Sequence, residues 1–159
     1  MEYKIVELGS IKIVGVKAEV SFTNNGQITR QIARKFMPRL SEIDERADDF
    51  TISLQQYDTF DFEKFNPHQT FEKWIGVMVN NFNNIPEGLD TLTISKGKYV
   101  VINFKGSVQQ FIELWRELHS TWLASKNFEL DNRPHFEKLP PSYNPMQVEN
   151  EEEIWIPIR

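Results

Sequence analysis

The sequence predicts an α+β domain made of two strand-helix-strand-strand modules, with a cleft between them. Two observations predict this fold. Stretches in which apolar residues alternate are followed twice along the chain by a stretch in which they recur every three to four residues. A segment rich in Asn, Pro and Gly, residues 80–89, separates the two runs. With 159 residues, we expect one domain with modules at about 1–80 and 89–159.

The first module opens with a strand and a helix. Residues Ile11 to Phe22 alternate, with a possible irregularity at Gly15, and Asn24-Asn25-Gly26 then marks a turn. The apolar period changes after this turn and predicts a helix over about 26–43. Pro38 predicts a kink in this helix or its early end, because proline lacks the backbone N–H.

Two further strands complete this module. Alternation predicts them at 50–57 and 71–79, and the Phe-rich stretch between, residues 57–70, is irregular.

The second module repeats this order. A strand is predicted at 98–104, and Ser107 is placed to cap the following helix. The apolar face of that helix comprises Val108, Phe111, Ile112, Trp115, Leu118 and Trp122. Strands at 134–139 and 153–158 follow, separated by Pro140-Pro141. The two sheets expected from the two modules could be separate or joined.

Composition excludes several classes of function. A net charge of −5 without a Lys or Arg run argues against nucleic-acid binding. No apolar run reaches the length of a membrane span, and the absence of cysteine makes the cytoplasm the default compartment. The histidines, at 68, 119 and 135, lack the spacing of zinc ligands, and no phosphate-binding loop or dinucleotide motif occurs. We therefore expect no metal and no cofactor.

Glu137 is the principal candidate for a functional residue. Alternation over 133–139 places Phe136 on one face and His135, Glu137 and Leu139 on the other. A carboxylate among aromatic side chains requires a positive partner to remain ionised. That partner is either a ligand or, if Glu137 is partly exposed on an edge strand, a nearby lysine. The remaining carboxylates, including Asp58, Asp61, Glu63, Glu87 and residues 149–153, are expected to be solvated.

Aromatic residues make up 13% of the chain and suit either a large core or a pocket for flat molecules. Trp115 and Trp122 are seven residues apart on one helix stripe and are typical of a core. Trp74 and Trp155, on strands flanking the predicted cleft, could serve core or ligand equally well. The Tyr57 hydroxyl could contact a ligand or a backbone group.

Four segments in order resemble a known group. They are Gly97–Ser107, Trp115–Ser125, Arg133–Glu137 and Ile154–Ile158. Their order is similar to that of the GyrI-like, AraC-type effector-binding domains, which are the ligand-sensing parts of multidrug-responsive bacterial regulators. The match is good over 97–158 and collinear but weaker over 1–80.

The resemblance implies a duplicated fold with a curved antiparallel sheet, two helices and a central cleft. It also implies that a glutamate, Glu137 here, meets the charge of lipophilic cations while aromatic side chains stack on them. Tyr57, Trp74 and Trp155 are carried over as those aromatics, and Trp115 and Tyr99 are further candidates. The family often has a tyrosine two residues after the glutamate, where this chain has Leu139.

The expected function is therefore a stand-alone binder of hydrophobic cationic small molecules, used for drug sequestration or transcription regulation. No helix-turn-helix segment fits in the sequence, so a regulator would be a separate protein partner. Two alternatives remain. The same glutamate could be the general base of a hydrolase acting on cyclopropane-bearing natural products. The chain could instead be an interaction module that binds a topoisomerase such as gyrase.

Overall fold

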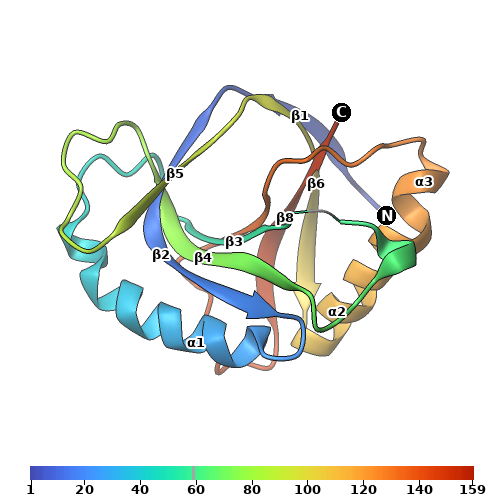
Figure 1. The fold of residues 1–159 in the computed structure, drawn as a ribbon, viewed down its shortest axis with the longest axis horizontal. Helices are drawn as coiled ribbons and strands as arrows, with labels where there is room; N and C mark the ends of the chain where they lie inside the picture. The colour runs from blue at the N-terminus through green and yellow to red at the C-terminus, as the bar shows by residue number, and fades with distance from the viewer. Residues whose placement is uncertain (59) are drawn as a thin grey trace.

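The computed structural model describes residues 1–58 and 60–159 as one eight-stranded antiparallel sheet with helices against one of its faces (Figure 1). The strand order is β1-β6-β8-β7-β3-β4-β2-β5. The strands are β1 Lys4–Leu8, β2 Ile11–Ser21, β3 Thr51–Gln56, β4 Thr70–Val79, β5 Asp90–Ile94, β6 Gly97–Gly106, β7 His135–Leu139 and β8 Asn150–Ile158. The predicted α+β class with a curved sheet and two main helices is confirmed.

The first helix, α1, spans Asn25–Phe36 and continues as a 3₁₀ helix, η1, over Met37–Glu42. Pro38 lies in the first turn of η1, so the predicted early end of the α-helix is confirmed. A second short 3₁₀ turn, η2, covers Phe62–Lys64 in the otherwise irregular segment between β3 and β4.

The second helix, α2, spans Val108–Glu117 and begins with the predicted cap. Ser107 accepts a hydrogen bond from the Gln110 backbone N–H, and the Gln110 side chain accepts one from the Ser107 N–H. The helix then widens into a π-helical turn, η3, over Leu118–Trp122 and ends in α3, Leu123–Ser125. No helix in the described part of the chain is long and apolar enough to cross a membrane.

Each predicted module gains one strand that the sequence analysis missed. β1 and β5 are five residues long and occupy the two edges of the sheet, where alternation is too short to stand out. β1 opens the first module but pairs with β6 of the second, and β5 opens the second module but pairs with β2 of the first. The two modules therefore exchange their first strands, and β3 and β7 join them at the centre.

The two faces of the sheet bury different clusters. On one face the curled sheet encloses a core that includes Trp74, Tyr99, Phe136 and Trp155. The other face carries α1 over β2 and β4, and the α2–η3–α3 helices over β6 and β8. Between these two helix-covered patches lie the middle strands β3 and β7. The site described next is on that part of the face.

Gly15 and Gly76 face each other across β2 and β4. A methyl group added to Gly76 would lie 2.5 Å from the Val14 carbonyl oxygen, closer than atoms can approach. The irregularity expected at Gly15 is absent, because β2 runs unbroken through it; the glycine pair instead allows the two strands to approach closely.

Candidate functional site

Glu137 lies on β7, at the middle of the sheet, on the face that carries the helices. Its register partners are Ser53 on β3 and Ile154 on β8. Phe136, next in the chain, points to the opposite face and is fully buried. The orientation predicted from alternation is therefore confirmed. Glu137 is partly buried, and its Oε1 accepts a hydrogen bond of 3.2 Å from the Gln55 amide.

Buried polar side chains surround Glu137 on the same face. Ser53, Gln55, Lys73 and His135 belong to three adjacent strands and are each less than 9% exposed. The Lys73 ammonium donates a 2.7 Å hydrogen bond to Ser53 Oγ. Among the described residues no carboxylate oxygen lies within 4.0 Å of the Lys73 nitrogen. A buried ammonium is thus held by a neutral hydroxyl, close to but not in contact with Glu137.

Glu152 on β8 is the other acid on this face. Ile154 of β8 is the register partner of Glu137. Glu152 lies two residues before Ile154 and therefore points to the same face of the sheet. The prediction that residues 149–153 are all solvated is therefore wrong for Glu152 and Glu153, which are both partly buried. The signal was available, because Glu152 shares its parity with the buried Ile154 and Ile156.

We call Ser53, Gln55, Lys73, His135, Glu137 and Glu152 the central polar strip. Burial raises the pKa of Glu137, while the charge of Lys73 and the Gln55 hydrogen bond oppose that rise. Burial, followed by the charge of Glu137, raises the pKa of Glu152 to about 8. Burial lowers the pKa of Lys73, and both carboxylates oppose this. Two acids thus share one internal cation in a poorly solvated place.

An aromatic cluster lies next to the polar strip. Tyr57, at the end of β3, stacks on Phe22 with ring centroids 6.0 Å apart and meets His135 edge-on at 5.2 Å. Trp115 of α2 lies 5.6 Å from Phe22 and 5.8 Å from Phe60. The cluster therefore joins the end of β2, the end of β3, helix α2 and the segment between β3 and β4.

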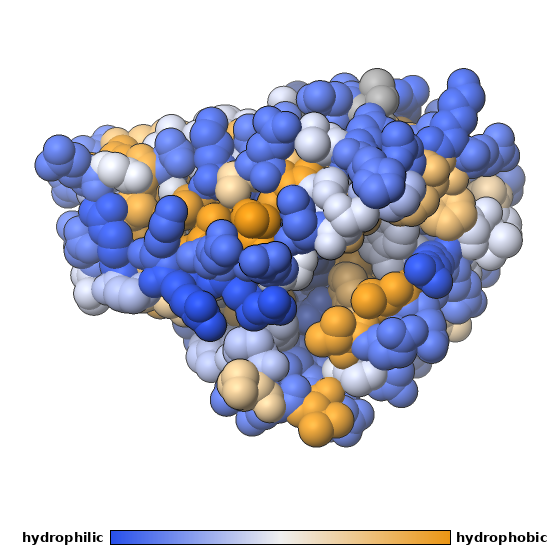
Figure 2. All heavy atoms as spheres, turned by 60° about the horizontal axis from the view of Figure 1, so that its bottom comes forward, coloured by the Kyte–Doolittle hydropathy of each residue, from blue (hydrophilic) through white to orange (hydrophobic). Residues whose placement is uncertain are grey.

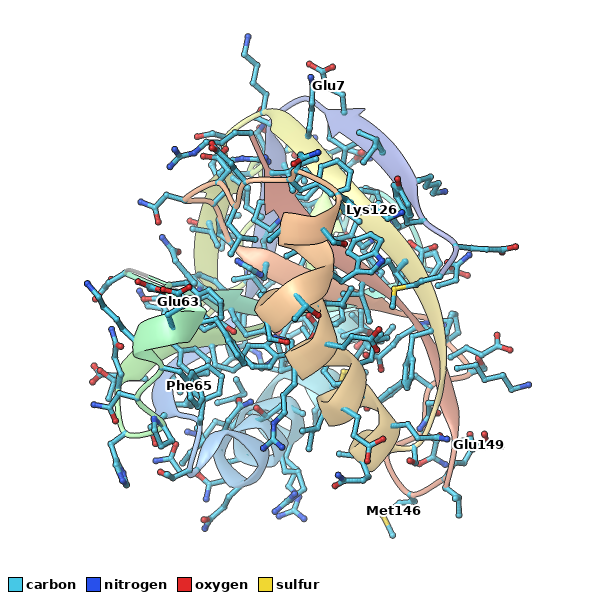
Figure 3. All side chains as sticks on the ribbon, turned by 90° about the vertical axis from the view of Figure 1, so that its right-hand side faces the viewer. Glu7, Glu63, Phe65, Lys126, Met146 and Glu149 are labelled. Carbon is cyan, nitrogen blue, oxygen red and sulfur yellow. The ribbon has the colours of Figure 1, made fainter. Side chains whose placement is uncertain are left out.

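That segment supplies much of the aromatic surface. Figure 3 shows Phe65 and Glu63 on it, to one side of α2, while Met146 and Glu149 lie at the base of the molecule. Phe65 also approaches Phe22 and Trp115, at 4.8 and 6.2 Å. A cavity of about 20 Å³ remains between Tyr57 and the segment, and such a volume holds about one water molecule.

Two histidines contact the aromatic cluster beside Glu137: His135 is buried and His119 is partly buried. The rings of His119 and His135 stack at 5.6 Å, and Trp115 lies 4.6 Å from His119. Burial lowers the pKa of His119 to about 4 and holds that of His135 well below its ordinary value. Both rings are therefore neutral at neutral pH. In the described part of the chain no three His, Cys, Asp or Glu side chains group as metal ligands.

The six candidate residues fall into two groups. Glu137, Tyr57 and Trp115 lie on the helix-bearing face, whereas Trp74, Tyr99 and Trp155 belong to the buried core on the opposite face. Trp74 is register partner of Leu54, and Trp155 of Phe136, so the strand pleat turns both away from Glu137. The expectation that these three share a wall with Glu137 is corrected by this geometry.

The comparisons with known proteins decide the family. The chain matches the model of the integron-associated effector-binding proteins, Cass2, over residues 4–158. The chain belongs to the Cass2 family. The resemblance to GyrI-like effector-binding domains is confirmed with it. No curated protein matches this Cass2 chain.

Three solved structures share the fold of this Cass2 protein. SAV2435, bound to tetraphenylphosphonium, has 17% identity and a TM-score of 0.72, with 100% of this chain and 94% of that chain covered. The Vibrio cholerae integron cassette protein has 17% identity and a TM-score of 0.67, with 99% of this chain and 95% of that chain covered. The EcmrR C-terminal domain has 14% identity and a TM-score of 0.67, with 99% of this chain and 97% of that chain covered. These likenesses show the fold.

Proposed function

We propose that this protein binds hydrophobic organic cations on the helix-bearing face, with Glu137 as counter-ion and Tyr57 and Trp115 as aromatic walls. One observation supports it above all. A partly buried carboxylate, whose only direct side-chain partner among the described residues is the Gln55 amide, lies beside a cluster of aromatic rings. Such a carboxylate gains from any cation that replaces its lost water.

The chemistry of the two walls suits a delocalised cation. A positive charge over a Trp or Tyr ring gains about 0.5–2 kcal/mol, more where water is excluded. Flat aromatic surfaces tolerate different shapes, so the class of ligand is set by charge and apolar surface. Anions are disfavoured by Glu137.

A drug-sized guest requires more space than the 20 Å³ cavity offers. Helix α2 carries an apolar stripe at 108, 112 and 115, whose lower members Val108 and Ile112 are 73% and 38% exposed. Figure 2 shows that this face of the molecule is hollowed near its centre. We expect the guest to occupy this hollow and to displace Phe60 and Phe65 from Trp115.

The proposed biological role is small-molecule sensing, coupled to transcription regulation or to drug sequestration. The fold is shared with SAV2435, solved with a lipophilic cation, and with the C-terminal domain of EcmrR. The cation of the first structure is therefore the probe of choice for this chain.

The test is a titration with tetraphenylphosphonium followed by tryptophan fluorescence, since Trp115 is in the proposed wall. Glu137→Gln keeps the shape and removes the charge, and we expect at least about tenfold weaker binding. Glu151→Gln, on an exposed residue of β8, is the charge-matched control and should bind as the wild type does. Equal affinity of Glu137→Gln and wild type would reject the counter-ion role. Tetraphenylphosphonium contains no cyclopropane ring, so this titration measures binding alone.

A further inference from the structure

Resting on this function, we propose that Glu152 is a second ligand-binding carboxylate and that Lys73 is a built-in cation, so that the site accepts one net positive charge. Two carboxylates and one ammonium leave a single negative charge when all are ionised. A monocation then makes the ionised strip neutral, whereas a dication leaves a positive charge uncompensated in a poorly solvated place.

The sheet register carries this inference. Glu137 on β7 and Glu152 on β8 lie on one face of the sheet, and Glu152 is two residues before Ile154, the register partner of Glu137. Lys73 comes from β4 on the other side, where it is 97% removed from solvent and turns along the strip to Ser53. With no carboxylate within 4.0 Å among the described residues, the ammonium acts on both acids through space rather than by closing an ion pair with one.

Without a ligand, the negative charge of the strip must be balanced by the protein itself. Two carboxylates on one face of adjacent strands, in a dry environment, share a proton when only one cation faces them. The pKa of Glu152, raised to about 8, places this proton in the neutral range. Uptake of a monocation therefore releases the proton, and apparent affinity rises as pH rises toward the pKa of the pair.

The other titratable groups facing the strip do not supply this proton. His135 on β7 and His119 on η3 have lowered pKa values and stay neutral at and above neutral pH. Tyr57 on β3 has its pKa raised by burial and by the charge of Glu137. Tyr143, in the β7–β8 connection, has its pKa raised by burial and by both acids, so it also stays protonated.

Ethidium and propidium form a matched pair of probes, because they share a phenanthridinium ring and carry one and two positive charges. We expect wild-type protein to prefer ethidium, with an affinity that rises by up to about tenfold per pH unit between pH 6 and 8. Glu152→Gln should lose about tenfold or more in ethidium affinity and most of the pH dependence. Glu151→Gln is again the control.

Restoring the charge balance gives the sharpest test. Lys73→Met leaves two acids without a cation and should shift preference toward propidium. The double variant Lys73→Met, Glu152→Gln returns the net charge to minus one and should regain ethidium binding relative to Glu152→Gln. Circular dichroism and thermal unfolding establish that each variant is folded.

The outcomes separate the two proposals. If Glu137→Gln loses binding while Glu152→Gln binds ethidium as the wild type does at every pH, Glu152 has no part in the site, and the proposed function stands. If neither substitution matters, both proposals fail. Loss of binding in the double variant, despite a native fold, would overturn the charge-balance role of Lys73.

Discussion

At the scale of single residues, the polar strip is where this protein departs from an ordinary sheet protein. Ser53, Gln55, Lys73 and His135 are buried on strands whose neighbours are Ile, Leu and Phe, and two hydrogen bonds between adjacent strands satisfy polar groups of the strip. Lys73 and Gln55 reach across strands to Ser53 and Glu137. Burial raises the pKa values of Glu137 and Glu152 in the same strip.

His119 gives a stability prediction at this scale. Its pKa in the folded protein is about 4, below the ordinary 6.5, so the folded state binds fewer protons than the unfolded state between these values. The neutral ring therefore contributes stability that is complete above pH 6.5 and is lost as pH falls toward 4. We expect wild type to lose about 2–3 kcal/mol relative to His119→Phe over this range.

Urea unfolding of both proteins at pH 7 and at pH 4.5 measures this difference. Because Glu152 titrates in both proteins, its contribution cancels in the comparison. His68→Gln, on the exposed segment between β3 and β4, is the control histidine. A constant difference between wild type and His119→Phe across the range contradicts the prediction.

At the scale of elements, local chemistry made some features predictable. Pro38 and Ser107 act on the residues beside them, so a single stretch of sequence contains the information that ends α1 and begins α2. Alternation likewise fixed the face of Glu137. The π-helical turn at Leu118–Trp122 has no such local signal. The single helix stripe predicted to hold Trp115 and Trp122 is divided at this turn: Trp115 contacts Phe22, whereas Trp122 contacts Tyr3.

Features set by pairing between distant strands could not be predicted. Alternation along β4 places Lys73 and Trp74 on opposite faces, but only the register with β3 and β7 shows which of them shares a face with Glu137. The same holds for Trp155 and Glu152 on β8. Resemblance to the family pointed to Glu137 and Tyr57 but not to the buried polar side chains around the glutamate.

The glycine pair gives a prediction for the sheet. Gly76→Ala forces a methyl group to within 2.5 Å of the Val14 carbonyl oxygen, so β2 and β4 must separate locally. We expect a loss of about 2–3 kcal/mol in the free energy of unfolding, as for other overpacked sites. Gly9→Ala, with no atom within 4 Å of the added methyl, is the control. Chemical denaturation showing equal stability for the two variants would contradict the role of close approach.

At the scale of the whole molecule, the exchange of β1 and β5 binds the two modules together. Each module lends an edge strand to the other, and the core on the closed face takes residues from seven of the eight strands with Val6 and Leu8 of β1 packed against it. A module alone would therefore expose both an unpaired strand edge and half of that core.

Fragment complementation tests this dependence. We expect residues 1–88 and 89–159, expressed separately, to lack the cooperative unfolding of a native domain, and to regain it when mixed in equal amounts. Far-ultraviolet circular dichroism during thermal unfolding measures both states. Independent cooperative unfolding of either fragment would show that the exchanged strands are dispensable.

The exchange of β1 and β5 suggests how a two-module chain could arise from a chain with one module. A short ancestral chain with one copy of the repeat would have had no neighbour within its own sequence to accept its first strand. It could complete its sheet by pairing with an identical chain, each lending that strand to the other in a symmetric dimer. Gene fusion of two such copies would preserve the arrangement and free each half to diverge, leaving Lys73 on one side of the join and both acids on the other.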